Sequence, residues 1–115
     1  MKSVDLLSEN LTLFTRIKGL SAKMETLISD GQIKAFLDIS TQRKDLQCQV
    51  IEFERRYGAI LKGRPEKGME EKILTISFEI TDVIRSIQEI DQKIKVLILE
   101  KRNTLFPDID NISPG

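Results

Sequence analysis

Apolar residues recur along three stretches of the chain at alternating steps of three and four residues, the spacing of one face of an α-helix. Each stretch therefore predicts an amphipathic helix with one stripe to bury, as in a coiled coil. The stripe residues are Leu6, Leu13, Leu20 and Leu27 in the first stretch, Phe36, Ile39, Leu46, Val50, Phe53, Tyr57 and Ile60 in the second, and Ile73, Ile76, Ile80, Val83, Ile87, Ile90, Ile94 and Leu97 in the third.

Two groups of turn-forming residues separate these stretches. In SDGQ at 29–32, Ser29 precedes Gln32 by three residues, which is the spacing of a capping box, and Gly31 relieves the turn. KGRPEKG at 62–68 supplies two glycines and a proline. Pro107 disfavours helical geometry at the residue before it. We therefore expect helices over roughly 4–28, 31–61 and 69–105.

The predicted fold class is all-α: an elongated antiparallel up-down-up three-helix bundle with coiled-coil-like packing. A chain of 115 residues with 40% hydrophobic content fits one domain. We place this domain at 1–106 and expect an irregular C-terminal tail at 107–115. The second and third helices should fold back on each other about Pro65, and the third should be about 55 Å long.

Charge and composition restrict the classes of partner. Eighteen Lys and Arg balance eighteen Asp and Glu, so no net field attracts a nucleic acid or an anionic membrane. No apolar run is long enough to span a membrane, and MKSVDLLSEN lacks the pattern of a signal peptide. Cys48 is the single cysteine, which agrees with a reducing compartment. We expect a cytoplasmic protein that binds neither nucleic acid nor membrane.

Residues for catalysis are missing from the sequence. The chain has no histidine, which removes the commonest general base and the commonest metal ligand. Neither KGRPEKG nor DIDNIS completes a phosphate loop or a calcium loop. Cys48 follows the stripe residue Leu46 by two positions, so we expect an outward and inert thiol. The sequence predicts no enzyme, no catalytic or metal-binding residues and no cofactor.

Arg43 is a charged residue at a stripe position of the second helix, within FLDISTQRKDL. Folding about Pro65 brings Arg43 near Ile87 and Asp91, and a pair with Asp91 would set the register of the helices. An unpaired buried charge there would be strongly destabilising. Two alternatives remain: Arg43 meets an acidic group of a partner, which makes it a candidate partner-binding residue, or its head extends to solvent.

The outward face of the third helix carries more apolar residues than one buried stripe requires. A contiguous exposed apolar patch is typical of a surface for a partner's amphipathic helix. Cover by a second copy of the chain, or by Ile109 and Ile112 of the tail, are the alternatives. The candidate partner-binding residues on this face are Leu74, Phe78, Val96, Leu99 and Phe106.

Two segments resemble a known family: QRKDLQ at 42–47, and IDQKIKVLILEKR at 90–102, with its spacing of Asp91, Ile94, Ile98 and Arg102. They are similar to the small flagellar export chaperones, most of all to the FliT-like chaperone of the filament cap protein. The resemblance implies a cytoplasmic helper that keeps an amphipathic helix of a secreted flagellar subunit soluble for type III export. Members of that family commonly have a fourth helix over the cargo surface, which FPDIDNISPG is not expected to supply.

Two classes of function therefore stand side by side. The first is an export chaperone that binds a protein helix, and the alternative is a homodimerising bundle that acts as a coiled-coil scaffold or adaptor subunit. A scaffold should carry a continuous apolar seam on its outward face. Arg85, Glu89 and Gln92 interrupt that face here, which favours a partner with its own local pattern.

Overall fold

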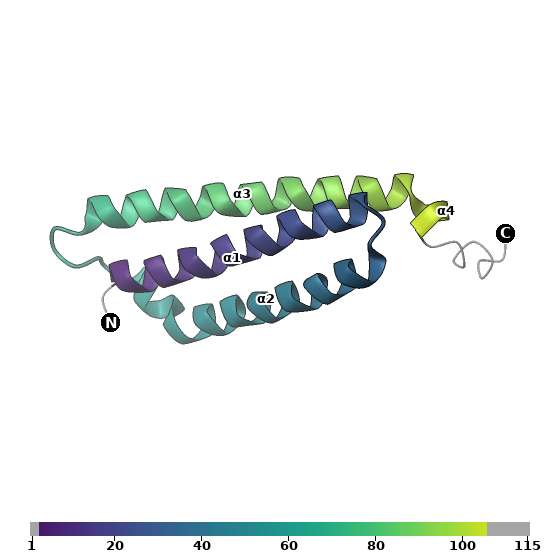
Figure 1. Cartoon of the computed structure of the whole chain (residues 1–115). Helices are drawn as coiled ribbons and strands as arrows, with labels where there is room; N and C mark the ends of the chain where they lie inside the picture. The colour runs from purple at the N-terminus through teal and green to yellow at the C-terminus, as the bar shows by residue number, and fades with distance from the viewer. Residues whose placement is uncertain (1–2, 106–115) are drawn as a thin grey trace.

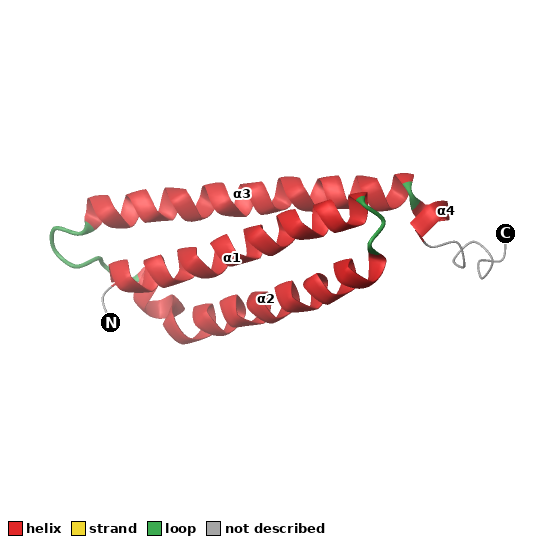
Figure 2. Ribbon diagram, viewed as in Figure 1, coloured by secondary structure: helices red, strands yellow, loops and turns green. Residues whose placement is uncertain are grey.

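The computed structural model describes residues 3–105, and within that range the chain consists of helices joined by short loops (Figures 1 and 2). The described residues contain no strand, so the predicted all-α class is confirmed. The molecule is elongated, with extents of 62 × 24 × 22 Å. The predicted tail at 107–115 lies outside the described residues. The elements are α1 (Ser3–Ser29), α2 (Ile33–Lys62), α3 (Glu70–Glu100) and a short α4 (Arg102–Leu105).

The turn between α1 and α2 occurs where the sequence predicts it, but its chemistry differs from the prediction. Gly31 has a positive φ of 76°, its N–H donates to the carbonyl of Ile28, and the N–H of Gln32 donates to Leu27. These two bonds form the glycine-dependent C-terminal cap of α1 known as a Schellman motif. Gln32 precedes α2 without a side-chain cap hydrogen bond, so the capping-box interpretation of Ser29 is wrong.

The loop between α2 and α3 also agrees with the predicted turn, and it reaches the start of α1. Gly68 adopts a φ of 85°, which is the left-handed region that glycine enters at little cost. The backbone N–H of Ser3 donates to Oε1 of Glu66 at 2.8 Å. This bond satisfies one of the amides that a helix N-terminus leaves without an internal partner, and it places a negative charge at the positive end of the α1 dipole.

The third predicted helix is interrupted near its end. α3 stops at Glu100, Lys101 has φ −103° and ψ 12°, and α4 follows from Arg102. The Lys101 ammonium donates to the backbone carbonyl of Ser29 at 2.5 Å. That carbonyl belongs to the last turn of α1, where carbonyls lack helical partners and a cation is favourable. The partner is 72 positions away in sequence, so the periodicity of the third helix cannot reveal this bond.

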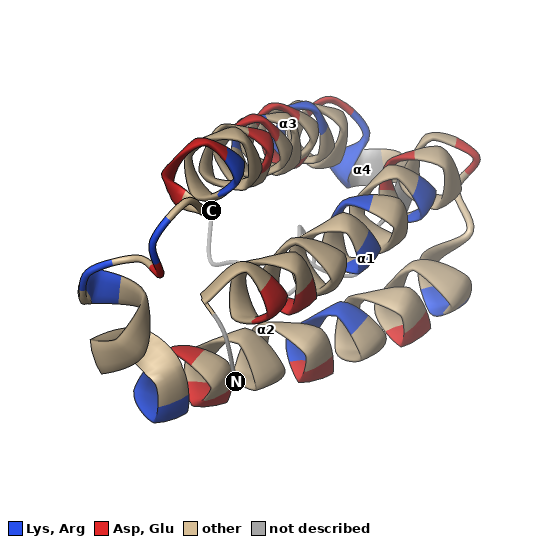
Figure 3. Cartoon of the chain, turned by 90° about the vertical axis from the view of Figure 1, so that its left-hand side faces the viewer, with Lys and Arg blue, Asp and Glu red and all other residues tan. Residues whose placement is uncertain are grey.

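The α1 helix is the central element of the bundle. Figure 1 shows α1 and α3 running in one direction and α2 in the other. α1 packs against both α2 and α3, whereas few backbone positions of α2 approach α3. The view in Figure 3 shows α2 and α3 on either side of α1, with charges of both signs on all three helices. The expected direct packing of the second and third helices about Pro65 is therefore largely replaced by packing of each on α1.

The buried core forms two clusters along α1. One combines Ile17 with Val50 and Ile87, and the other combines Met24 and Ile28 with residues of α2 and α3, namely Phe36, Ile39 and Ile94. The buried residues of α3 are Ile80, Ile87 and Ile94, which lie seven positions apart in the predicted stripe. In α1 the buried column runs instead through Leu6, Asn10, Ile17, Ser21, Met24 and Ile28. Leu6 of the predicted leucine heptad belongs to this column, whereas Leu13, Leu20 and Leu27 flank it and are half-buried, because α1 has a neighbour on each side.

Candidate functional site

A polar layer connects all three long helices midway along the bundle. Arg43 of α2 donates through Nη1 to the carboxylate of Asp91 on α3 and to Oγ of Ser21 on α1, the latter at 3.1 Å. Ser21 is fully buried, and its hydroxyl donates in turn to the carbonyl of Ile17 at 2.8 Å. This layer lies between the two buried clusters in the order of residues along every helix. The predicted pairing of Arg43 with Asp91 is confirmed, and the contribution of Ser21 is a further finding.

An open groove runs between α2 and α3, with α1 as its floor, and we call it the α2–α3 groove. Because the outer helices pack on α1 more than on each other, apolar side chains next to their buried stripes remain uncovered. On the side of the polar layer nearer the α2–α3 loop, this groove forms a hollow of about 400 Å³, which we call the proximal hollow. Its apolar lining consists of Phe14, Ile17, Val50, Ile51, Ile84 and Ile87.

A second hollow of about 350 Å³, the distal hollow, continues the groove beyond the polar layer. Arg43 and Asp91 form part of its lining, together with Ser40 and Lys95. Its apolar lining consists of Met24, Phe36, Ile94, Ile98 and Leu99. The α2–α3 groove is therefore apolar at both ends and crossed by one ion pair in the middle. Such a surface is complementary to the apolar face of a helix.

Four of the residues predicted to face a partner lie on the surface, as the heptad pattern requires. Leu74, Phe78, Val96 and Leu99 are all exposed, and Phe78 and Leu99 retain 62% and 63% of their accessible surface. Leu99 belongs to the distal hollow. The other three do not line the two hollows of the α2–α3 groove. Phe106 lies outside the described residues, and contact of these residues with a partner stays a prediction.

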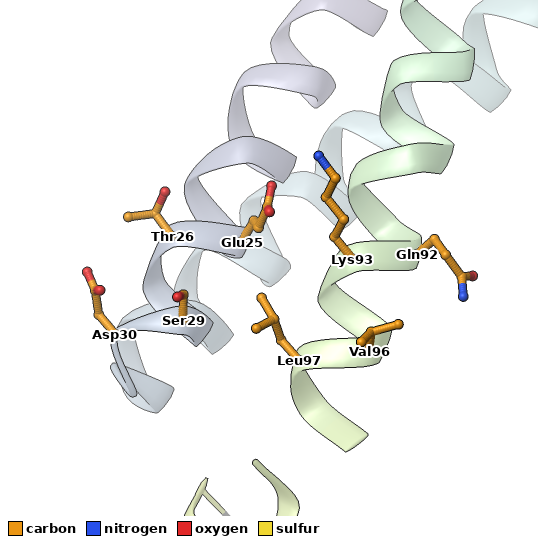
Figure 4. A pocket seen from close by; sticks show the side chains of 8 residues that line it. All are labelled: Glu25, Thr26, Ser29, Asp30, Gln92, Lys93, Val96 and Leu97. Carbon is orange, nitrogen blue, oxygen red and sulfur yellow. The ribbon is translucent and has the colours of Figure 1, made fainter. Parts of the chain in front are cut away.

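Figure 4 shows the opposite directions of neighbouring side chains near the end of α3. Leu97 points toward α1, whereas Val96 and Gln92 point away from it. The hollow drawn there, about 610 Å³ between α1 and α3, has six polar lining residues and two apolar ones. It therefore lacks the apolar floor of the α2–α3 groove. The lining residues are Glu25, Thr26, Ser29, Asp30, Gln92, Lys93, Val96 and Leu97.

Arg43 was a candidate for contact with a partner, and the structure shows how far it remains accessible. Its side chain is 17% exposed, and that of Asp91 is 43% exposed. Both side chains line the distal hollow while bonded to each other. The pair therefore presents a net-neutral polar surface in the α2–α3 groove, in place of a free cation for an acidic partner.

Sequence reasoning missed the α2–α3 groove although one signal for it is present. Ile51, which is 67% exposed, follows the stripe residue Val50 directly, and Ile84 and Ile98 form a second apolar column beside the α3 stripe. These additional columns mark the sides of α2 and α3 that would face each other in a closed bundle. The structure leaves Ile51 exposed and Ile84 and Ile98 half-buried.

Cys48 is exposed, as predicted, in a shallow hollow between α1 and α2. Glu52 lies in the same hollow, and its hydrogen bonds from Arg55 lower the pKa of the carboxyl below its ordinary value. The same contact raises the pKa of Arg55. Both side chains are exposed and lie three residues apart on one helix, so this is a solvated surface pair.

Among residues 3–105 no group of three or more His, Cys, Asp or Glu side chains is arranged to hold a metal ion. No helix in that part of the chain combines the length and apolar character needed to cross a bilayer. The α2–α3 groove, with its mostly apolar lining, is the candidate binding site that we consider below. Comparison of the chain with protein-family models, with curated proteins and with solved structures finds no match.

Proposed function

We propose that this chain is a chaperone or adaptor that binds an amphipathic helix of another protein in the α2–α3 groove, and that it is not an enzyme. The observation that carries the proposal is the apolar lining of this groove on both sides of the polar layer, where Ile51 and Leu99 are exposed at the edges of the two hollows. A partner helix there would contact α2 and α3 at once, above α1. The assembly would then have a four-helix arrangement in which the apolar sides of α2 and α3 that line the groove are covered.

The resemblance to the small flagellar export chaperones suggests a particular partner. On that basis we propose a cytoplasmic chaperone of type III flagellar export whose cargo is a helix of the filament cap protein. Support comes from the similarity of QRKDLQ and IDQKIKVLILEKR to segments of that family. Both segments contribute to the polar layer, through Arg43 and Asp91. Shielding an apolar cargo helix requires an apolar surface and no catalytic group, and the α2–α3 groove supplies such a surface.

The test is capture of a purified filament cap protein from a flagellated bacterium, with the full chain immobilised. Ile51→Lys and Leu99→Lys change exposed apolar side chains of the α2–α3 groove, so they should leave the thermal midpoint nearly unchanged and abolish capture. Leu37→Lys is the matched control, because Leu37 is an exposed leucine of α2 that lines neither hollow and is not a candidate partner-binding residue. Equal capture by the parent, the groove variants and the control would overturn the proposed site.

The alternative function, a homodimerising scaffold, is tested with the same variants. A second copy that covered the α2–α3 groove would make the parent a dimer in sedimentation, with a midpoint that depends on protein concentration. Ile51→Lys would then convert it to a monomer. A monomeric parent that captures the cap protein supports the chaperone function. A dimer that ignores the cap protein supports the scaffold.

A further inference from the structure

The ion pair that crosses the α2–α3 groove retains hydrogen-bonding capacity on both partners. Arg43 uses Nη1 for its bonds to Ser21 and Asp91, and among the described residues its Nε and Nη2 have no partner. Asp91 accepts from Arg43 through Oδ1, and Oδ2 has no partner in the same range. Both residues line the distal hollow, so both face whatever occupies the groove. The middle of the groove therefore offers donors and an acceptor side by side.

A continuous apolar helix face would fit this position poorly. Placing a leucine over the pair would remove water from a guanidinium and a carboxylate without replacing the lost hydrogen bonds, which is costly. A lysine over the pair would add a third cation to a hollow that already holds Arg43 and Lys95, and a glutamate would place a second carboxylate beside Asp91. A carboxamide supplies an N–H₂ donor for the carboxylate and a carbonyl acceptor for the guanidinium, and it adds no charge.

We propose that the helix which occupies the α2–α3 groove carries one asparagine or glutamine at the middle of its apolar face, bonded to Arg43 and Asp91. Apolar residues on either side of this amide fill the proximal and distal hollows. The inference rests on the proposed function, and its occupant is a helix of another protein. In the same way, one buried amide can set the register of two helices in a coiled coil.

The length of the occupant follows from the position of the hollows. Their lining on α3 begins at Ile84 and ends at Leu99, with Asp91 near the middle. At 1.5 Å per residue this distance is about 22 Å, so a helix of about 18 residues covers it with about one residue to spare at each end. An amide at the centre of that helix meets the ion pair whichever way the helix runs.

The probe is a set of designed helical peptides of about 18 residues, with leucines at alternating steps of three and four. The first peptide has glutamine at the central apolar position. The second has the same composition, but its glutamine is exchanged with the next leucine along the stripe, so hydrophobicity and helix propensity are matched. Two further peptides have lysine or glutamate at the centre. Binding to the full chain is measured by fluorescence anisotropy at one salt concentration.

We expect the centred glutamine peptide to bind about tenfold more tightly than the shifted one, the factor expected from one or two net hydrogen bonds. In the double variant Arg43→Leu with Asp91→Leu the order should reverse, because the layer is then apolar and favours leucine at the centre. Circular dichroism of this variant checks that the fold is retained. Preservation of the order in the double variant would show that the ion pair does not select the amide.

Each remaining result has a defined meaning. If all four peptides bind equally well, and Ile51→Lys weakens the binding of each, the groove binds a helix but does not select an amide. That result leaves the proposed function intact and overturns the inference. Tightest binding of the lysine or glutamate peptide shows a charge-selective layer and also overturns it. If no peptide binds, or if the parent is a dimer that Ile51→Lys dissociates, the groove does not take a foreign helix and both proposals fail.

Discussion

Arg43 of α2 and Asp91 of α3 form an ion pair above the buried hydroxyl of Ser21, so one guanidinium connects three helices. This polar layer lies between the two core clusters, at the point where the ion pair crosses the α2–α3 groove. A misaligned helix would separate donor from acceptors, because the bonds are directional. The pair is therefore a register device for the bundle as well as part of the surface that a ligand would meet.

Removal of the arginine alone should destabilise the protein. Arg43→Leu leaves Asp91 without its partner, and the free energy of unfolding should fall by about 1–2 kcal/mol, less than for a fully buried pair because Asp91 stays partly hydrated. Adding Asp91→Leu should recover most of this loss, since the double variant places two apolar residues at the same level. Urea unfolding followed by circular dichroism measures the free energy of unfolding of the single and the double variant. Losses that simply add would show that the two side chains are not coupled.

Neighbouring aliphatic residues of α3 should differ sharply in their contribution to stability. Ile94 is buried in the cluster with Met24 and Phe36, so Ile94→Ala should lower the free energy of unfolding by about 2–4 kcal/mol. Val96 is exposed and points away from α1, so Val96→Ala should change the free energy of unfolding by less than about 0.5 kcal/mol. Thermal unfolding of the two variants under the same conditions tests this. Similar losses would contradict the orientation of α3.

Two glycines should respond in opposite directions to alanine. Gly19 lies within α1 with no atom within 4 Å of an added Cβ, so Gly19→Ala should stabilise the protein by about 0.5–1 kcal/mol through helix propensity. Gly68 has φ 85° in the loop before α3, so Gly68→Ala should destabilise it by about 1–2 kcal/mol. Chemical denaturation midpoints report both changes. A stabilising Gly68→Ala would show that the loop does not need the left-handed conformation.

The thiol of Cys48 should react without unfolding of the protein. Because the side chain is exposed on α2, a bulky maleimide should label the native protein about as fast as a free peptide thiol at the same pH. Helicity measured by circular dichroism should be the same before and after labelling. Labelling that becomes rapid only in denaturant would mean that Cys48 is covered in solution, for example by a second copy of the chain.

Sequence periodicity was sufficient for the number and approximate extents of the long helices, but not for the cap at Gly31 or the end of α3 at Glu100. Steps of three and four residues specify which side of each helix is apolar, and the glycines at 31 and 68 mark where the chain must turn. The same reasoning paired Arg43 with Asp91, because both interrupt an apolar column at nearly the same distance from the α2–α3 loop. It also placed Val96, Leu99 and Cys48 on the surface correctly. The exposure of a residue follows from its position within its own helix. The pairing of Arg43 with Asp91 follows from the distance of each residue from the loop that connects α2 and α3.

The arrangement of the helices around α1 was decided only by the tertiary structure. Periodicity gives the direction of an apolar face but not which other face meets it, and three similar stripes allow either a closed bundle or a central helix with two neighbours. The choice of α1 as the centre uncovers the α2–α3 groove and brings Ser21 under Arg43. It also brings Lys101 to the carbonyl of Ser29, and α3 ends at the residue before Lys101. These contacts join residues at least 22 positions apart, so they depend on packing that no local pattern records.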